Sequence, residues 1–265
     1  QQFGEFVTLK IENMTVQHNE ITNGSHDHAH PHPAPEVKEE AVVGPKKKYA
    51  ILTVATGKGL INTFKEIGAD YIVEGGQSMN PSTEDFIKGF DTLNAENIIV
   101  FPNNKNIILA ARQSAKMYRK AKVHVVETKT LAQGFSALTM LDLNGEIGDI
   151  MSDIQSVISN VITGQITYAV RDTDIGGLTI KKDDYIAILD GKIIASRRRR
   201  QDAFKELLTK VNTEEKEIVT IIHGEGVPTR EINDLIRHIE RNYSNLEVDV
   251  IEGNQEVYSY ILAIE

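Results

Sequence analysis

Apolar and polar positions follow a regular order from residue 49 to residue 141. Four short apolar runs of strand length are each followed by a segment in which apolar residues recur at helical spacing. The expected strands are residues 49–54, 69–76, 97–102 and 123–128, and the expected helices are residues 56–68, 82–94, 106–120 and 131–141. Because the strands are apolar on both faces, they indicate a parallel sheet with helices on both sides.

After Gly145 the order of elements changes. An amphipathic helix is expected first, and a two-residue turn at Asp190-Gly191 predicts a β-hairpin over residues 183–196. The other expected elements are strands at residues 164–172, 217–224, 246–252 and 258–264, and helices at residues 145–162, 202–211 and 229–241. The sequence therefore predicts an α/β protein with a parallel-sheet lobe at residues 49–143 and a mixed α/β second lobe at residues 144–265.

Two segments of other character precede these lobes. Residues 1–22 show the alternation of a β-hairpin, which is too small to be stable alone, so we expect them to end a preceding middle domain. Residues 23–48 hold four of the seven prolines and few large apolar side chains, which is typical of a disordered linker. The chain starts at Gln1 without an initiator Met, and we expect it to be a fragment of a longer protein.

The linker contains four alternating histidines, His26, His28, His30 and His32. Imidazole binds Zn, Ni or Cu, so metal binding is one interpretation. A dedicated site also needs a rigid frame and supporting hydrogen bonds, which a Pro-rich stretch does not supply. We favour a solvated linker and expect no dedicated metal site.

Composition narrows the classes of function. The 265 residues contain no cysteine, which excludes disulfides, thiolate metal sites and a cysteine nucleophile. No apolar run has the length of a membrane span, and the first residues do not form a signal peptide, so we expect a cytoplasmic location. A net charge of -9 and an aromatic content of 6% disfavour nucleic acid as a partner.

The loops after the four strands carry the candidate contacts of the first lobe. In an open parallel sheet, ligands bind beyond the carboxyl ends of the strands. The candidate residues there are Lys58, Gln77, Ser78, Asn80, Ser82, Asn103, Asn104 and Lys105. They suit an anion or a polar partner surface better than acid–base chemistry, and each loop alone has the simpler interpretation of turn and capping residues. We expect no catalytic residue.

Other polar clusters have weaker interpretations. Arg197, Arg198, Arg199 and Arg200 precede an expected helix, and they are either an exposed charged turn or a contact for an acidic protein surface. The carboxylates of residues 172–184 fit turns around Gly176-Gly177 better than a Mg²⁺ site. His223 ends a strand and is the candidate base of a hydrolase, but no nucleophile is recognisably paired with it.

Three segments carry a resemblance to a known family. Residues 75–85, which read Gly-Gly-Gln-Ser-Met-Asn-Pro-Ser-Thr-Glu-Asp, together with residues 102–106 and 55–60, resemble the C-terminal domain of the ATP-binding subunit of bacterial fatty acid kinases. This family is dihydroxyacetone-kinase-like, and its C-terminal domain is similar in fold to the DegV fatty-acid-binding family. The candidates at residues 77, 78, 80, 82 and 103–105 fall on the family's motif positions.

The resemblance implies a division of labour. In the family, an N-terminal domain binds Mg-ATP through an Asp-Gly-Asp loop, and a separate fatty-acid carrier protein presents the acyl carboxylate for phosphorylation. Here Asp-Gly occurs only at Asp190-Gly191, so the ATP domain is missing and we expect no cofactor and no kinase activity in this chain alone. The expected function is docking of the carrier protein. The alternative is a stand-alone fatty-acid or small-carboxylate binding protein of the DegV type, and self-association stays open.

Overall fold

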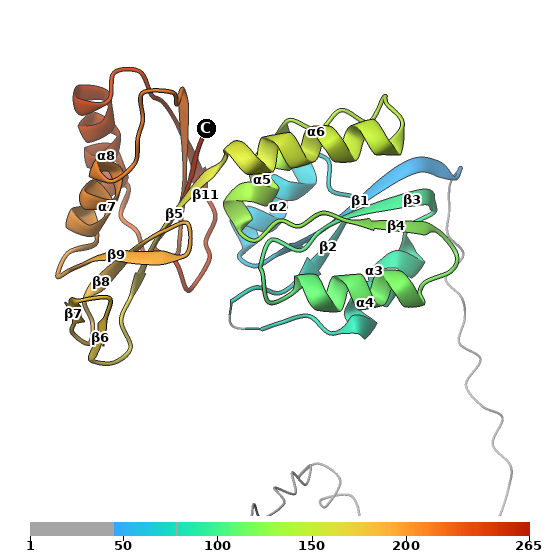
Figure 1. Ribbon diagram of the computed structural model, residues 1–265, viewed down its shortest axis with the longest axis horizontal. Coiled ribbons are helices and arrows are strands. Elements are labelled where there is room, and N and C mark those ends of the chain that lie inside the picture. Colours follow the sequence, from blue (N-terminus) through green and yellow to red (C-terminus); the bar gives the residue numbers. More distant parts are fainter. Residues whose placement is uncertain (1–44, 78) are drawn as a thin grey trace, which may run out of the picture. The chain divides into compact units, whose positions relative to one another are not determined.

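The computed structural model describes residues 45–77 and 79–265, in which seven helices and twelve strands form two α/β lobes (Figure 1). The predicted hairpin at residues 1–22, the histidines of the predicted linker and Ser78 lie outside these residues. The predicted fold class is confirmed, with a parallel sheet in the first lobe and a mixed sheet in the second. None of the described helices is long and apolar enough to cross a lipid bilayer.

The first lobe is built on sheet A, a parallel sheet with the strand order β2-β1-β3-β4. Its strands are β1 (Lys47–Ala55), β2 (Tyr71–Glu74), β3 (Ala95–Phe101) and β4 (Lys122–Val125). β1 includes Lys47 and Lys48, which the sequence pattern placed in the linker. The Lys47 ammonium group lies 2.6 Å from Asp70, and that of Lys48 lies 2.9 Å from Glu146. Both lysines at the exposed start of β1 therefore have a carboxylate partner.

Helices cover both faces of sheet A, as predicted (Figure 1). Neighbouring residues of one strand point to opposite faces, so Ile51 of β1 packs on one group of helices and Leu52 on the other. The helices on the Ile51 side are α2 (Lys58–Glu66), α5 (Leu131–Thr139) and α6 (Ile147–Asn160). Those on the Leu52 side are α3 (Thr83–Thr92) and α4 (Ile108–Met117).

The second lobe is built on sheet B, with the strand order β11-β10-β12-β5-β8-β9. Its strands are β5 (Ile162–Tyr168), β8 (Tyr185–Leu189), β9 (Lys192–Arg197), β10 (Ile218–His223), β11 (Glu247–Glu252) and β12 (Tyr260–Ile264). Only the β10–β11 pair is parallel. Two helices, α7 (Arg200–Thr209) and α8 (Thr229–Asn242), pack on one face of this sheet through Phe204, Leu235 and their neighbours.

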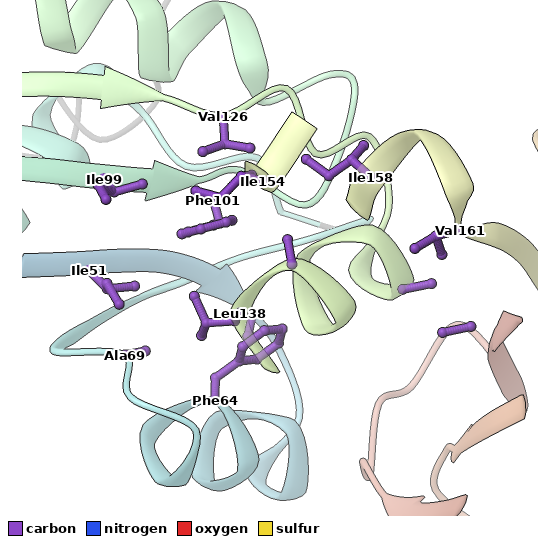
Figure 2. Packing of buried hydrophobic residues seen from close by; sticks show 14 of the residues in the cluster. Ile51, Phe64, Ala69, Ile99, Phe101, Val126, Leu138, Ile154, Ile158 and Val161 are labelled. Carbon is purple, nitrogen blue, oxygen red and sulfur yellow. The ribbon is translucent and has the colours of Figure 1, made fainter. Parts of the chain in front are cut away.

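The other face of sheet B shares a core with the first lobe. Ile222 of β10 and Ile261 of β12 belong to the same buried cluster as Phe64 of α2. Figure 2 shows part of this cluster, in which Phe64 and Leu138 face each other beneath the strands of sheet A. All five residues of β12 are buried because helices or the first lobe cover both of its faces.

Two stretches differ in detail from the pattern. The strand expected at residues 164–172 ends at Tyr168, and a short hairpin follows, formed by β6 (Thr173–Ile175) and β7 (Leu178–Ile180). Gly176 and Gly177 adopt positive φ angles of 58° and 81° at its turn, which residues with a Cβ rarely adopt. The turn predicted at Asp190-Gly191 is confirmed: it joins β8 to β9, and both residues have positive φ.

Candidate functional site

The carboxyl ends of the strands of sheet A meet the segment that joins β11 to β12. Leu60 of α2 donates its backbone N–H to the carbonyl oxygen of Gly253 at 3.0 Å. Gly59 lies so close that an added Cβ would be 1.7 Å from the carbonyl oxygen of Glu252. The turn before α2 is therefore filled by the second lobe, and Lys58 remains exposed at its rim.

Two hollows open beside this contact. The smaller has a volume of about 30 Å³ and lies between the ends of β1, β2 and β3 and residues 255–258 of the second lobe. The larger has a volume of about 810 Å³ and extends from the loops of sheet A to α6 and the β8–β9 turn. Gln77, Asn104 and Tyr258 line both hollows, so we call them together the crevice.

Asn103 holds this edge of sheet A together. Its backbone has a φ of 57°, and its side-chain Nδ2 donates to Thr53 Oγ1 at 2.7 Å and to the Val54 carbonyl oxygen at 2.9 Å. Its own N–H donates to Thr128 Oγ1 at 2.9 Å. These bonds tie the end of β3 to β1 and to the loop after β4. Asn103 is a structural link between strands, and its neighbour Asn104 is the one that faces the larger hollow.

Asn104 is 3% exposed, and its amide is only partly used. Its Oδ1 accepts the backbone N–H of Asn106 at 2.9 Å, while its Nδ2 has no hydrogen-bond partner among the described residues. Across the smaller hollow, Gln255 Oε1 is similarly without a partner in that part of the chain. A buried polar atom without a partner is costly, and these two atoms lie in residues that line the crevice.

Polar side chains dominate the lining of the larger hollow. They are Gln77, Asn104, Lys105, Asn106, Glu127, Lys129, Thr130, Gln133, Gln155, Ser159, Thr163, Gln165 and Asp190. Several are already fixed: Thr130 caps α5 and lies 2.9 Å from Thr163, and Asp190 accepts the backbone N–H of Thr163 at 2.9 Å. Ile158, Val161, Ile162, Ile188 and Tyr258 add apolar surface, so the lining is mixed and offers hydrogen-bonding groups along most of its length.

Two predicted contact residues of the β2–α3 loop, Ser82 and Asn80, are not among the residues that line the crevice. Ser82 caps α3: its hydroxyl accepts the N–H of Asp85 at 3.2 Å, and Asp85 accepts the Ser82 N–H at 2.9 Å. These bonds from the Ser82 backbone and hydroxyl hold the pKa of Asp85 below its ordinary value. Asn80 is exposed. Thus Gln77, Asn103, Asn104 and Lys105 reach the crevice, and Ser82 works as a helix cap.

The arginine run is mostly occupied by internal ion pairs. Arg197 pairs with Glu206 at 2.6 Å and Arg199 with Asp202 at 2.7 Å. Arg200 is half-buried, and its Nε lies 2.6 Å from Glu231 Oε1, which also accepts the Tyr260 hydroxyl at 2.7 Å. Burial, followed by this bond to the carboxylate, raises the pKa of the Tyr260 hydroxyl. Within the run, only Arg198 is exposed without an ion pair to a described residue.

The remaining candidates offer no catalytic geometry. His223 Nδ1 is buried without a hydrogen-bond partner, and no Ser, Thr or Lys of the described residues is bonded to the ring. Asp172 and Asp184 accept backbone N–H groups of Lys182 and Lys181 and so serve the turns around the β6–β7 hairpin, as the sequence indicated. Within residues 45–77 and 79–265, no three His, Cys, Asp or Glu side chains are grouped to hold a metal ion.

Sequence reasoning missed the second lobe's share of the crevice. Gln255 and Tyr258 line it, yet they lie far along the chain from the loops of sheet A. A polar stretch between two expected strands, residues 253–257, was the available signal. It indicated a loop and gave no sign that this loop faces sheet A.

Comparison with known proteins agrees with this architecture. Residues 50–265 match the family of C-terminal regions described as fatty acid kinase, FakA-like. The chain belongs to this family. It is 39% identical over 265 residues to protein YloV of Bacillus subtilis and 38% identical to an uncharacterized protein of Staphylococcus epidermidis. Both alignments cover 100% of this chain but 46% and 47% of those proteins, so the chain spans about half the length of the curated relatives it matches.

Solved structures show the same fold at low identity. A DegV family protein from Thermus thermophilus, described as fatty-acid-binding, has a TM-score of 0.56 at 11% identity and covers 82% of this chain and 100% of its own. The Fak B3 protein of Streptococcus pneumoniae, loaded with linoleic acid, has a TM-score of 0.57 at 10% identity over 82% of this chain and 99% of its own. The dihydroxyacetone kinase of C. freundii has a TM-score of 0.54 at 13% identity, over 83% and 48%. The expected resemblance to both families is confirmed for the fold.

Proposed function

We propose that this chain docks a fatty-acid-carrying protein for the fatty acid kinase of which it forms the C-terminal part, in the cytoplasm. Family membership supplies the kinase context. The Streptococcus pneumoniae Fak B3 protein supports a separate carrier, because it is described as a fatty acid kinase protein and its structure is loaded with linoleic acid. In this proposal the chain binds the carrier protein, and phosphoryl transfer takes place in other parts of the kinase.

The observation that carries this proposal is the number of polar side chains that line the crevice. The smaller hollow has about 30 Å³, enough for one or two water molecules. The larger hollow has the volume of a ligand site, but hydrogen-bonding side chains line most of it. An acyl chain placed there would leave many polar groups without water or partners, which is unfavourable. A polar protein surface satisfies the same groups.

The reaction that the docked carrier would enter is phosphoryl transfer to a carboxylate. An oxygen of the acyl carboxylate forms a bond to the γ-phosphorus of ATP, the bond from that phosphorus to the β–γ bridging oxygen breaks, and ADP leaves with the electron pair. The sequence has no Asp-Gly-Asp loop, and in the described residues no three His, Cys, Asp or Glu side chains are grouped as ligands for a metal ion. We therefore assign the nucleotide to the part of the parent protein outside this chain.

Isothermal titration calorimetry tests the proposal with three separate titrants. They are a fatty-acid-loaded carrier protein of the DegV type from the same organism, free fatty acid below its micellar concentration, and Mg-ATP. We expect saturable heat with the loaded carrier and none with the other two. If titration with the loaded carrier gives no heat of binding, the docking role is contradicted.

The second candidate function, a stand-alone fatty-acid or small-carboxylate binding protein, is tested in the same experiment. It is supported by the fold shared with fatty-acid-binding DegV proteins and by the unpartnered Asn104 Nδ2 in the crevice. Saturable heat with free fatty acid and none with the carrier establishes it. Replacement of Asn104 by Ala then abolishes that heat if the amide binds the carboxylate.

A further inference from the structure

The outward side of α4 is an unpartnered helix face. Its inward side packs on sheet A through Ala111, with Ile107 and Tyr118 buried just beyond its two ends. The exposed residues of the helix follow the spacing of one helical face: Leu109, Arg112, Gln113, Lys116 and Met117. No described element of the chain covers them.

Two large apolar side chains stand on this face. Leu109 is 67% exposed and Met117 is 62% exposed, and they lie two turns apart, about 12 Å along the helix axis. Single exposed apolar residues are common on protein surfaces, so either residue alone would carry no argument. Their place on one helical face, with the charges described next, is what distinguishes this surface.

The face is strongly basic in an acidic chain. The chain has 38 acidic and 29 basic residues, yet residues 97–126 contain six basic residues and no acidic one. Two of the six are paired with carboxylates from neighbouring segments, Arg112 with Glu127 and Lys120 with Asp91. The other four are exposed, and no ion pair joins them to any described residue: Lys105, Lys116, Arg119 and Lys122. Because Val123 of β4 packs on the α4 side of sheet A, its neighbour Lys122 points to the opposite face, which leaves three of these cations for the α4 side.

We propose that the α4 face, meaning Leu109 and Met117 with Lys105, Lys116 and Arg119, binds an acidic surface of the carrier protein. This inference rests on the proposed docking function and names the surface that performs it. Unpaired cations favour a partner of opposite charge through steering and specificity. The two apolar side chains supply contacts that lose water on docking, and methionine is enriched in such interfaces.

A protein partner fits this face better than a membrane. A helix that lies in a lipid surface needs a broad, continuous apolar side. On α4, Gln113 and two cations separate Leu109 from Met117, and the remaining side of the helix is packed on sheet A. Lys105 also lines the larger hollow, so the α4 face is continuous with the crevice.

The test compares two charge-reversal variants of the 265-residue chain by calorimetry with the fatty-acid-loaded carrier. The first variant is Lys116→Glu with Arg119→Glu. The matched control is Lys65→Glu with Lys210→Glu, which reverses two exposed lysines at the ends of α2 and α7. We expect the first variant to bind the carrier about tenfold more weakly and the control to bind like the unmodified chain. Urea unfolding of both variants verifies that they are folded.

Ionic strength and two further probes complete the test. Affinity of the unmodified chain for the carrier should fall as salt rises, and the Lys116→Glu, Arg119→Glu variant should show a weaker dependence. Equal carrier affinity of the two variants overturns the assignment of the surface, while the docking function itself stands. The assignment is also overturned if the first variant loses only binding to phosphatidylglycerol vesicles or only self-association in light scattering. No carrier binding by the unmodified chain refutes the docking function, and the α4 assignment with it.

Discussion

Replacement of Gly59 by Ala should destabilise the whole two-lobe unit, although alanine is the better helix former. Gly59 is the second residue of α2, and an added Cβ would lie 1.7 Å from the Glu252 carbonyl oxygen and 2.8 Å from its carbonyl carbon. Ordinary contact begins at 3.4 Å, so the backbone must move by about 3.4 - 1.7 = 1.7 Å. The atoms that must move are main-chain atoms at the end of β11, held to β10 by the Gly253 N–H bond to the His223 carbonyl oxygen at 2.9 Å.

The magnitude follows from three contributions. Overpacking against backbone costs about 1–3 kcal/mol, and loss of the Leu60–Gly253 hydrogen bond costs about 1 kcal/mol. Higher helix propensity offsets about 0.5–1 kcal/mol of this. The free energy of unfolding should therefore fall by about 1–3.5 kcal/mol, which lowers the urea midpoint by roughly 0.5–1.5 M at an m-value of about 2–3 kcal/mol/M.

Gly148 supplies the matched control. It is the second residue of α6, and no atom lies within 4 Å of the position of its added Cβ. Gly148→Ala should raise the free energy of unfolding by about 0.5–1 kcal/mol. Urea unfolding followed by far-ultraviolet circular dichroism measures both variants. If Gly59→Ala unfolds at the same midpoint as the unmodified chain, the close approach of α2 and β11 is refuted.

Two further predictions concern side chains of the second lobe and of the α3–α4 side. Arg200→Met should lower the free energy of unfolding by about 3 kcal/mol, because Glu231, 14% exposed, keeps a charge without its partner. Arg199→Met, in an ion pair at the surface, should leave the urea midpoint unchanged. Burial, followed by the bond to Asp91, raises the pKa of Tyr118 to about 12 from its ordinary 10.0, so the folded state keeps a proton that the unfolded state loses. Stability should therefore decline between pH 10 and about 12, and unfolding free energies across that range should show a smaller decline for Tyr118→Phe.

The first lobe could be predicted well because its information is local. Each strand of sheet A is a short apolar run, and each helix beside it carries its own periodicity, so neighbouring residues are enough to place both. Helix ends were less certain: the pattern extends to residue 120, but α4 ends at Met117. Tyr118 there turns to an extended backbone and donates its hydroxyl to the Phe90 carbonyl oxygen at 3.1 Å. Because that contact is made with another helix, it does not change the spacing of apolar residues in the sequence of α4.

The crevice was predictable only on one side. The rule that ligands bind at the carboxyl edge of a parallel sheet drew attention to Gln77 and Asn104, and both line the crevice. It could not separate Asn104, whose Nδ2 has no partner among the described residues, from Asn103, whose Nδ2 donates two hydrogen bonds to β1. The arginine run shows the same limit, since four adjacent charges look alike in sequence, yet one is half-buried against Glu231. Such differences arise from partners that are distant in the chain.

The place of β12 in sheet B has a consequence for synthesis on the ribosome. β12 is the last strand in the sequence, and it lies between β10 and β5, which reach each other only through it. Sheet A can form as soon as its own residues have emerged, because all four of its strands lie within residues 47–125. Sheet B stays in two pieces until residues 260–264 emerge, and α2 and α5 meanwhile expose the apolar side chains that Ile261 and Ala263 later cover. The nascent chain must therefore pass through a partly folded intermediate with exposed apolar side chains. Chaperone binding and misassembly are most favoured in that intermediate.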